Sequence, residues 1–579
     1  MVKTDAISNS VTQSVLRQVL LIRSSQPENV FGPFTSELLR SEGLSGFETV
    51  DIDSAGLPEF GEGDLIILTR CFLRYAECDS LKAAVEAGAR LVCFSPPPSL
   101  LARFGWCSLM RVTYPGWIRI EKGYPCGGES IQTHVPVDSN APEDDASRFV
   151  TVAESINPDF TDTGSPAVVK QSMGKGEVAM FFYDMPKAVA RIRFGNPDLA
   201  SHLTSNLTSW PHTTELFTHH LDDRATHLPQ ADIHCQLLAK VLTDISAWPL
   251  PRFWYYPSAK HCSAAIFQGD GDESTLQEFT TQSDFVLACG GTATYFLRTS
   301  TKLTEKDVEK FRAKGHTFGP HPWGIDRVEE PYFRVPETLG PETNAFKKRF
   351  GDYSRTIQNH YAPWMGYMDW VEDHIRNGFR MLFAYITRWP NQLMCGSGRP
   401  IRFFDNDGKL YDCWQQPICI YDDIRLQKII EEDIEPLLSD LRSLINEATE
   451  RSHTSIGVLS HPRSFVGYSR PYIGACLELL AERSIPIFNG DEWCDFQYRR
   501  DATRIAVSQG DSKITCIVSN LEGELPLMIP IDGHDTQLSV IIDGQAIEAN
   551  VVHRLEENYL IIALTGKADK SDIQIEFRK

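Results

Sequence analysis

The chain has 579 residues, more than the about 250–300 at which one hydrophobic core stops growing, so we expect several domains. Its 42% hydrophobic and 23% charged residues are typical of a folded soluble protein, and no run of eighteen apolar residues predicts a membrane span. The formal charge of −21 argues against a general phosphate-backbone binder, so neither nucleic acid nor membrane is expected as a partner.

The beginning of the chain carries no long apolar segment. Residues 1–23 start with polar side chains and contain only the short apolar run Val19–Ile22, whereas a secretory signal needs a longer one. We therefore expect a cytoplasmic protein. The fourteen cysteines are scattered and form no C-x-x-C pair, which favours buried free thiols over disulfides.

Strand and helix patterns alternate over the first hundred residues. Buried or alternating strands are predicted at Gln18–Arg23, Phe47–Asp53, Asp64–Arg70 and Arg90–Phe94, with a helix at Asp79–Ala89. This alternation predicts a parallel sheet covered by helices.

The segment Asp79–Pro97 resembles glutamine-amidotransferase-like domains of the ThuA type, which are Rossmannoid (flavodoxin-like). The resemblance implies such a domain over residues 1–204, with Gly174–Arg193 as its closing strands. Catalytic members carry a G-x-C-x-G motif, but Cys71 lacks the flanking glycines, so we interpret the domain as non-catalytic. By analogy of fold alone, it could assist assembly into a homo-oligomer.

Two further regions flank the middle of the chain. Residues 205–258 are rich in Trp, Pro and His and are interpreted as a connector with one helix at Asp232–Ile245. Residues 501–579 change to short alternating strands with Gly or Asn turns, which predicts a small antiparallel β-sandwich. The predicted strands are Arg504–Ser508, Lys513–Ser519, Gln537–Ile542, Ile547–Val552, Tyr559–Thr565 and Ile573–Phe577.

The middle third contains a strand that ends in two carboxylates. In Ser263–Ser274 the apolar residues lead into Asp270 and Asp272, which project the same way if the strand continues. Two converging carboxylates persist where a cation or a proton repays their repulsion. Gly269 and Gly271 would let a metal or substrate approach the backbone. Alone, the pattern is equally compatible with a solvated Asp-Gly turn.

The segments that follow favour a functional interpretation of Asp270 and Asp272. A strand is predicted at Gly291–Arg298, a helix at Glu305–Lys314, and then the motif G-H-T-F-G-P-H-P-W at Gly315–Trp323. This order resembles the polysaccharide-deacetylase (NodB-type, carbohydrate esterase 4-like) family, with Thr294-Tyr295-Phe296 at its A-T-F-F strand. The resemblance implies a distorted (β/α) barrel over residues 259–500.

The resemblance also implies roles for individual residues. Asp270 would be the general base that activates water, and Asp272 and His321 would bind the metal. The position of the family's second metal histidine holds Ile325. His360, at the end of the predicted strand Arg355–His360, is favoured over Asp326 as the third ligand, although water or no metal at all stays open.

A later strand, Ile456–Leu459, is followed by His461. In the family, a histidine after a late strand is the general acid that protonates the leaving amine, which suggests this role for His461. The loops Cys395–Phe404, with Arg399 and Arg402, and Tyr411–Asp423 are interpreted as lining the site. Core packing is the default for the tryptophans that could otherwise stack on sugars: Trp323, Trp364, Trp370 and Trp414.

Together these patterns predict a hydrolase that depends on a divalent metal, with Zn²⁺ favoured by mixed N and O ligands. It would remove an acyl group from an amino sugar or hydrolyse a related C–N amide or an acetyl ester. Its partner would be a carbohydrate or a small amide substrate. The alternative is a catalytically degenerate barrel that acts as a carbohydrate- or ligand-binding scaffold.

Overall fold

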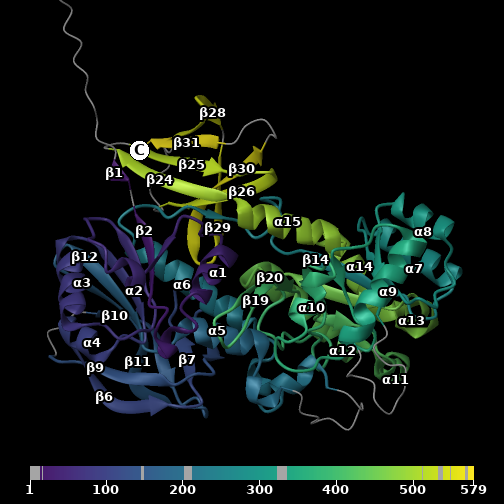
Figure 1. The fold of residues 1–579 in the computed structure, drawn as a ribbon, viewed down its shortest axis with the longest axis horizontal. Helices are drawn as coiled ribbons and strands as arrows, with labels where there is room; N and C mark the ends of the chain where they lie inside the picture. The colour runs from purple at the N-terminus through teal and green to yellow at the C-terminus, as the bar shows by residue number, and fades with distance from the viewer. Residues whose placement is uncertain are drawn as a thin grey trace, which may run out of the picture.

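The computed structural model describes most of the chain, and Figure 1 shows its three regions. An N-terminal region (purple and blue) and a central region (teal and green) lie side by side, and a C-terminal region (yellow) lies over them. One continuous cluster of buried apolar side chains includes Phe34, Trp254, Trp364 and Leu527, so the regions share a core. The described residues are 14–15, 17–144, 149–200, 211–322, 335–510, 513–531, 539–547, 549–566 and 572–578.

A nine-stranded sheet forms the N-terminal region, in the order β3-β2-β4-β5-β12-β11-β10-β7-β8. The first five strands are parallel and the remainder run antiparallel, so the predicted parallel sheet has an antiparallel extension. A separate pair, β6 (Trp106–Thr113) and β9 (Val137–Pro142), lies beside it. The strands of the large sheet are β2 (Gln18–Ile22), β3 (Glu48–Asp51), β4 (Leu65–Leu68), β5 (Arg90–Phe94), β7 (Trp117–Ile120), β8 (Ser130–Gln132), β10 (Phe149–Ile156), β11 (Asp162–Met173) and β12 (Gly176–Phe181).

Helices cover this sheet, and one of them corrects a prediction. Only the first part of Gly174–Arg193 is a strand, because Asp184 accepts a hydrogen bond from the Lys187 N–H and begins a helix. The helices are α1 (Phe34–Ser41), α2 (Ile52–Ala55), α3 (Tyr75–Ala87), α4 (Pro98–Arg103) and α5 (Met185–Phe194), with 3-10 turns η1 (Pro27–Asn29) and η2 (Pro197–Leu199).

The segment interpreted as a connector is part of the core. Its helix α6 (Gln230–Ile245) is buried along nearly its whole length and packs against α5 and α1. The Gln236 amide donates to the Ser452 carbonyl at 2.6 Å, which ties α6 to the central region. The other elements are η3 (Thr213–Phe217), η4 (Asp223–Ala225) and β13 (Arg252–Phe253).

Two mostly parallel sheets form the central region. One has the order β16-β15-β14-β22-β21, with β23 also paired to β14, and the other has the order β17-β18-β20-β19. The Ser354 N–H donates to the Phe318 carbonyl and the Ile418 N–H to Tyr385, so the sheets are linked at both sides. A distorted barrel would make such links, and the barrel interpretation stays a prediction. The strands are β14 (Ala265–Asp270), β15 (Thr294–Leu297), β16 (Thr317–Pro320), β17 (Thr356–Ile357), β18 (Met381–Leu382), β19 (Ile401–Phe404), β20 (Leu410–Gln415), β21 (Ile420–Tyr421), β22 (Ile456–Ser460) and β23 (Ile487–Phe488).

Helices surround these sheets (Figure 1). The predicted helix at Glu305–Lys314 is α8, which Thr304 and Asp307 begin with a reciprocal capping box. The helices are α7 (Leu276–Ala288), α8 (Glu305–Arg312), α9 (Val335–Phe350), α10 (Val371–Arg376), α11 (Ile424–Glu432), α12 (Glu435–Asn446), α13 (Pro462–Ser464), α14 (Arg470–Glu482) and α15 (Gly490–Ala502), with π turns η6 (Glu447–Arg451) and η7 (Phe465–Ser469).

The C-terminal region consists of two antiparallel sheets, in the orders β1-β24-β25-β31-β27-β28 and β13-β26-β30-β29. Strand β1 comes from the beginning of the chain and β13 from the connector, so three distant segments build this region. The predicted strand Ile547–Val552 is instead divided between β28 and β29. The strands are β1 (Ser14–Val15), β24 (Arg504–Gly510), β25 (Lys513–Ser519), β26 (Gly523–Pro530), β27 (Ser539–Ile542), β28 (Gln545–Ile547), β29 (Asn550–Arg554), β30 (Glu557–Gly566) and β31 (Asp572–Arg578).

Two expectations from composition can be compared with the structure. All fourteen cysteines are free thiols and most are buried, as predicted. Within the described part of the chain, no helix combines the length and the apolar character that crossing a bilayer requires.

Candidate metal centre and active site

The side chains singled out from the sequence meet at one edge of the central sheets. Strand β14 ends at Asp270, β16 ends just before His321, and β22 ends just before His461. Because parallel strands present their carboxyl ends at the same edge, these side chains lie together although up to about 190 residues separate them. Asp272 and His360 come from the loops after β14 and β17.

Three of these residues form a compact group. His321 Nε2 lies 3.4 Å from Asp272 Oδ1, and His360 Nδ1 lies 2.9 Å from the same oxygen. The two histidine nitrogens lie 3.0 Å apart. Both histidines are buried, and among the described residues this is the one group of three or more His, Cys, Asp or Glu side chains positioned to share an ion.

These separations test whether a zinc ion fits. Tetrahedral zinc with bonds of 2.0–2.1 Å requires its ligand atoms to lie about 3.3 Å from one another. The three separations between ligand atoms, 2.9, 3.0 and 3.4 Å, lie within about 0.4 Å of this value. The donor set of two imidazoles and one carboxylate is also one that zinc accepts. The residues therefore fit a divalent ion of this kind.

The orientation of His321 supports the same interpretation. Its Nδ1–H donates to the Gln358 carbonyl at 2.7 Å, which leaves the lone pair of Nε2 directed at the group. Metal-binding histidines are characteristically held in this way by a hydrogen bond on the far ring nitrogen. Because Gln358 lies between β17 and His360, one loop orients the first histidine and supplies the second.

Asp270 lies against the same group without joining it. Its Oδ2 is 3.7 Å from His321 Nε2, and its Oδ1 is buried with no hydrogen-bond partner among the described residues. Asp270 is 5% exposed, whereas the Asp272 side chain is 29% exposed. A buried carboxylate with an uncommitted oxygen beside a metal site is placed to accept a proton.

His461 approaches the group from the end of β22, the parallel neighbour of β14. Its Nε2 is 3.8 Å from Asp272 Oδ2, and its Nδ1 is 2.7 Å from Asp422 Oδ1. Asp422 is 1% exposed and also accepts hydrogen bonds from Ser460, Ser469 and the His461 backbone N–H, at 2.8, 2.7 and 3.0 Å. Asp422 thus fixes both the ring and the backbone of His461.

The electrostatic environment shifts the pKa values of Asp270 and Asp272 in opposite directions. Burial raises the pKa of Asp270. Burial also favours the neutral form of Asp272, but hydrogen bonds from His321 and His360 outweigh it and lower the pKa of Asp272. For His461, burial opposes protonation, yet the nearby Asp422 carboxylate raises the pKa to about 10. Such opposed shifts are characteristic of sites in which one group accepts a proton and another donates one.

Gly269 and Gly271 allow close packing against β15 and not the approach of a ligand that was expected. A Cβ atom at Gly269 would lie 2.4 Å from the Tyr295 ring, and one at Gly271 would lie 2.8 Å from the Phe296 carbonyl oxygen. Strand β15 therefore fills the space that was assigned to a ligand. Strand β14 ends at Asp270 and does not continue to Asp272, which takes a left-handed backbone conformation (φ 37°), yet both carboxylates still face His321.

Other expectations about the site are wrong or lie outside the described residues. Arg399 and Arg402 do not line this site: they pair with Glu42 and Asp501 in the interior. Trp364, Trp370 and Trp414 are 1, 5 and 3% exposed and pack in the core. Of the residues singled out from the sequence, Trp323, Ile325 and Asp326 lie outside the described residues.

His316, the other histidine of the G-H…H motif, is structural. Its Nδ1 accepts the Ala293 N–H at 3.1 Å, and its ring packs near Tyr295 and Phe311. The residue that sequence reasoning missed is Asp422, which stands inside the segment Tyr411–Asp423 without a motif of its own. Its position directly after the short apolar run Ile418–Tyr421, the last two residues of which form β21, was the available signal.

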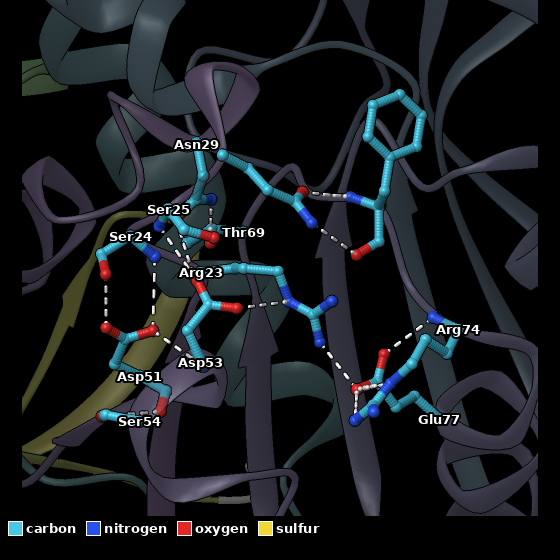
Figure 2. A network of polar contacts seen from close by, with 12 residues as sticks. Arg23, Ser24, Ser25, Asn29, Asp51, Asp53, Ser54, Thr69, Arg74 and Glu77 are labelled. Atoms are coloured by element: carbon cyan, nitrogen blue, oxygen red, sulfur yellow. Dashed lines mark hydrogen bonds and ion pairs between the residues drawn. The ribbon is translucent and has the colours of Figure 1, made fainter.

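The N-terminal sheet has a polar edge of its own, which Figure 2 shows. In open α/β sheets, ligands bind beyond the carboxyl ends of the strands. Here Asp51 accepts from the Ser24 hydroxyl at 2.5 Å and Arg23 pairs with Glu77 at 2.7 Å, so charged groups neutralise one another. The Asp53 carboxylate, in α2, accepts from the Ser25 backbone N–H in the loop after β2. This edge is filled by its own side chains.

Cys71, the nearby thiol, is equally inert. Burial raises its pKa to about 12, so it remains a thiol and not a thiolate at neutral pH. Both features agree with the expectation that the N-terminal domain is non-catalytic, which stays a prediction, as does its ThuA-type assignment.

Comparisons with known proteins gave only loose likenesses. No family model and no curated protein matches the sequence. Among solved structures, Agd3, described as a novel carbohydrate deacetylase, is similar over 98% of this chain and 99% of its own, with a TM-score of 0.43 and 11% identity. The T48 deacetylase is similar over 41% of this chain and 95% of its own, with a TM-score of 0.23 and 11% identity.

Glycosidases are also among the similar structures. The exo-β-1,4-mannosidase Op5Man5 from Opitutaceae bacterium strain TAV5 covers 30% of this chain and 32% of its own, with a TM-score of 0.24 and 15% identity. At these scores the likenesses carry no functional argument, which must come from the site itself.

Proposed function

We propose that the protein is a metal-dependent hydrolase of the polysaccharide-deacetylase type that removes an acyl group from an amino sugar or hydrolyses a related C–N amide bond. One observation carries the proposal: Asp270 and His461 face the group Asp272–His321–His360 from two different strand ends. A proton acceptor and a proton donor on either side of a metal site are the parts that amide hydrolysis requires.

Asp272, His321 and His360 would hold the ion, with Zn²⁺ the proposed metal. Bound there, a divalent ion would lower the pKa of water and stabilise negative charge on a carbonyl oxygen. The tautomer of His321, fixed by the Gln358 carbonyl, is the one such binding needs. Asp326 is the alternative third ligand.

The remaining residues would move protons. Asp270, with its free Oδ1, accepts a proton as the water oxygen bonds to the acyl carbon. The C–N bond then breaks, and His461 donates its Nε2 proton to the departing nitrogen. Asp422 keeps His461 oriented and favours the protonated ring. The products are a free amine and a carboxylic acid.

This arrangement favours an enzyme over a degenerate binding scaffold. Asp422 is a buried carboxylate that accepts four hydrogen bonds from His461 and its neighbours, and binding a ligand alone does not require a histidine to be held in this way. Such a group costs free energy to bury, and positioning a proton donor is a function that repays it.

An exposed aromatic ring beside the metal group supports a sugar substrate. The Tyr361 side chain is 51% exposed, and its ring centroid lies 4.1 Å from that of His360. Exposed aromatic rings offer an apolar face for the C–H side of a pyranose. Small amides and acetyl esters would use the same chemistry without this contact.

Metal analysis and acetate release test the proposal. The purified protein should contain about one zinc per chain and release acetate from N-acetylated amino-sugar oligomers such as chito-oligosaccharides. Asp272→Ala should lose both metal and activity, whereas Asp423→Ala, at a partly exposed neighbour of the site, should lose neither. Stoichiometric metal in Asp272→Ala would refute the site. Comparison of His360→Ala with Asp326→Ala identifies the third ligand, because only the true ligand's removal should empty the site.

A further inference from the structure

A second polar cavity lies where the N-terminal and central regions meet, and it shares no residue with the metal group. Its volume is about 40 Å³. Side chains from α1, α5, α6 and α15 and from the loop before β19 line it, so all of these elements converge on one small space. The residues that matter here are Glu37, Arg193, Asp232, Arg399 and Arg500.

Two buried arginines line this cavity with unused hydrogen-bond donors. Arg193 is 2% exposed, donates through Nε to the Gln415 side chain at 3.0 Å, and has no partner for Nη2 within the described structure. Arg399 is 7% exposed and commits only Nη2, to Glu42 and Asp232 at 2.8 and 3.1 Å. Its Nε and Nη1 have no partner there. Unmade hydrogen bonds of buried charged groups are costly.

Positive charge exceeds negative charge around this cavity. Arg193 forms no ion pair among the described residues, and Arg500 donates to four backbone carbonyls instead of to a carboxylate. The described arginines of the cluster are Arg40, Arg193, Arg252, Arg399, Arg402 and Arg500, and its carboxylates are Glu37, Glu42, Asp232, Asp412 and Asp501. Arg193 and Arg500 are the buried guanidinium groups of this cluster that have no ion pair among the described residues, which is unusual unless an ion supplies the counter-charge.

We propose that this cavity binds a small inorganic anion of the size and charge of chloride, held by the free donors of Arg193 and Arg399. A water molecule needs about 10–15 Å³ of such space, so the cavity accommodates a halide with one or two waters but no phosphate ester or sugar. The anion joins elements from three parts of the chain. Its site lies apart from the metal group and does not depend on the proposed hydrolase activity.

Two carboxylate oxygens also line the space, and their environment is compatible with an anion. The Glu37 carboxylate already has a positive partner, because Arg402 Nη1 lies 3.8 Å from its Oε2 and the Arg402 backbone N–H donates to its Oε1 at 3.0 Å. Asp232 is paired with Arg399 through its Oδ1, so its charge is already compensated.

Bromide is the probe, because it replaces chloride and scatters anomalously. Crystals of the full chain grown without chloride and soaked in sodium bromide should show an anomalous peak between Arg193 and Arg399. Water density there without an anomalous peak, or bromide only at the surface, would overturn the proposal.

Thermal unfolding in solution is the second measurement. At constant ionic strength, replacing gluconate by bromide should raise the unfolding midpoint by about 1 °C for each tenfold increase in bromide above its dissociation constant. Arg193→Met should abolish this dependence, and Arg442→Met, which removes an exposed arginine on α12, should preserve it. Equal midpoints of the unmodified protein in bromide and gluconate would contradict the proposal even if Arg193→Met fails to fold.

Discussion

The Asp422–His461 pair allows the sharpest test of the proposed proton donor. Asp422→Asn keeps the size of the side chain and removes its charge. In the structure this carboxylate accepts hydrogen bonds from Ser460, Ser469 and both the backbone and Nδ1 of His461. An amide has one acceptor oxygen, so its NH₂ group must face at least one of these donors or reverse the His461 tautomer.

The expected decrease in kcat follows from the loss of general acid catalysis when the His461 tautomer is reversed. General acid catalysis contributes about 10²–10⁴ in rate. In serine proteases, the same exchange beside a catalytic histidine lowers kcat about 10⁴-fold through the wrong tautomer. We therefore expect Asp422→Asn to lower kcat about 10²- to 10⁴-fold, with KM and metal content unchanged because Asp422 belongs to neither the metal group nor the exposed surface.

The assay is acetate release from N-acetylated sugar oligomers, with zinc content measured on the same samples. Asp423→Asn is the matched control, since Asp423 is adjacent, caps α11 and does not contact His461. If Asp422→Asn retains more than half of the wild-type kcat with full metal content, His461 is not the proton donor as argued.

The other predictions concern substrate affinity and acid stability. Tyr361→Ala should raise KM for sugar oligomers about 3- to 10-fold with kcat and metal content unchanged. Tyr75→Ala, at an exposed ring of the N-terminal region, should leave KM, kcat and metal content unchanged. An unaltered KM in Tyr361→Ala would show that this ring does not bind the sugar. Burial raises the pKa of Glu42, but its two arginine partners outweigh burial and hold the pKa below its usual value of 4.5. The stability that this ion supplies is complete above pH 4.5 and is lost as pH falls through the lowered pKa. Glu42→Gln should cost about 3–5 kcal/mol in urea unfolding at neutral pH and flatten the acid dependence, unlike the exposed Glu48→Gln; wild-type stability at pH 7 would contradict this.

Segments with a strong local signal were predictable. The buried apolar runs that became β2, β4 and β5 need both faces covered, and a sequence shows this directly as consecutive Val, Ile and Leu residues. Asp270, at the end of β14, and His461, directly after β22, carried a similar signal, whereas His321 was singled out through the resemblance to the polysaccharide-deacetylase family. The resemblance implied that these residues share one site, and the common carboxyl edge of the parallel strands is the physical reason why they lie together.

Features that depend on long-range pairing were not predictable. Arg399 and Glu42 are 357 residues apart, and an arginine in a glycine-rich loop gives no sign that it is buried. Strand β26 was missed because Pro526 normally argues against a strand interior, yet its carbonyl accepts the N–H of Trp254, the residue directly after the two-residue β13. In each case the partner that stabilises the residue lies in another region.

The C-terminal region borrows β1 from the start of the chain and β13 from its middle, and this fixes an order of events during synthesis. The partner of β1 is β24 and that of β13 is β26, so both segments leave the ribosome hundreds of residues before their partners exist. Until then each is an unpaired edge, the kind of segment that chaperones recognise and that pairs with the wrong chain. The C-terminal region can complete its fold only after β24 and β26 are made. A ribosome that stalls before these strands would leave β1 and β13 unpaired at the same time.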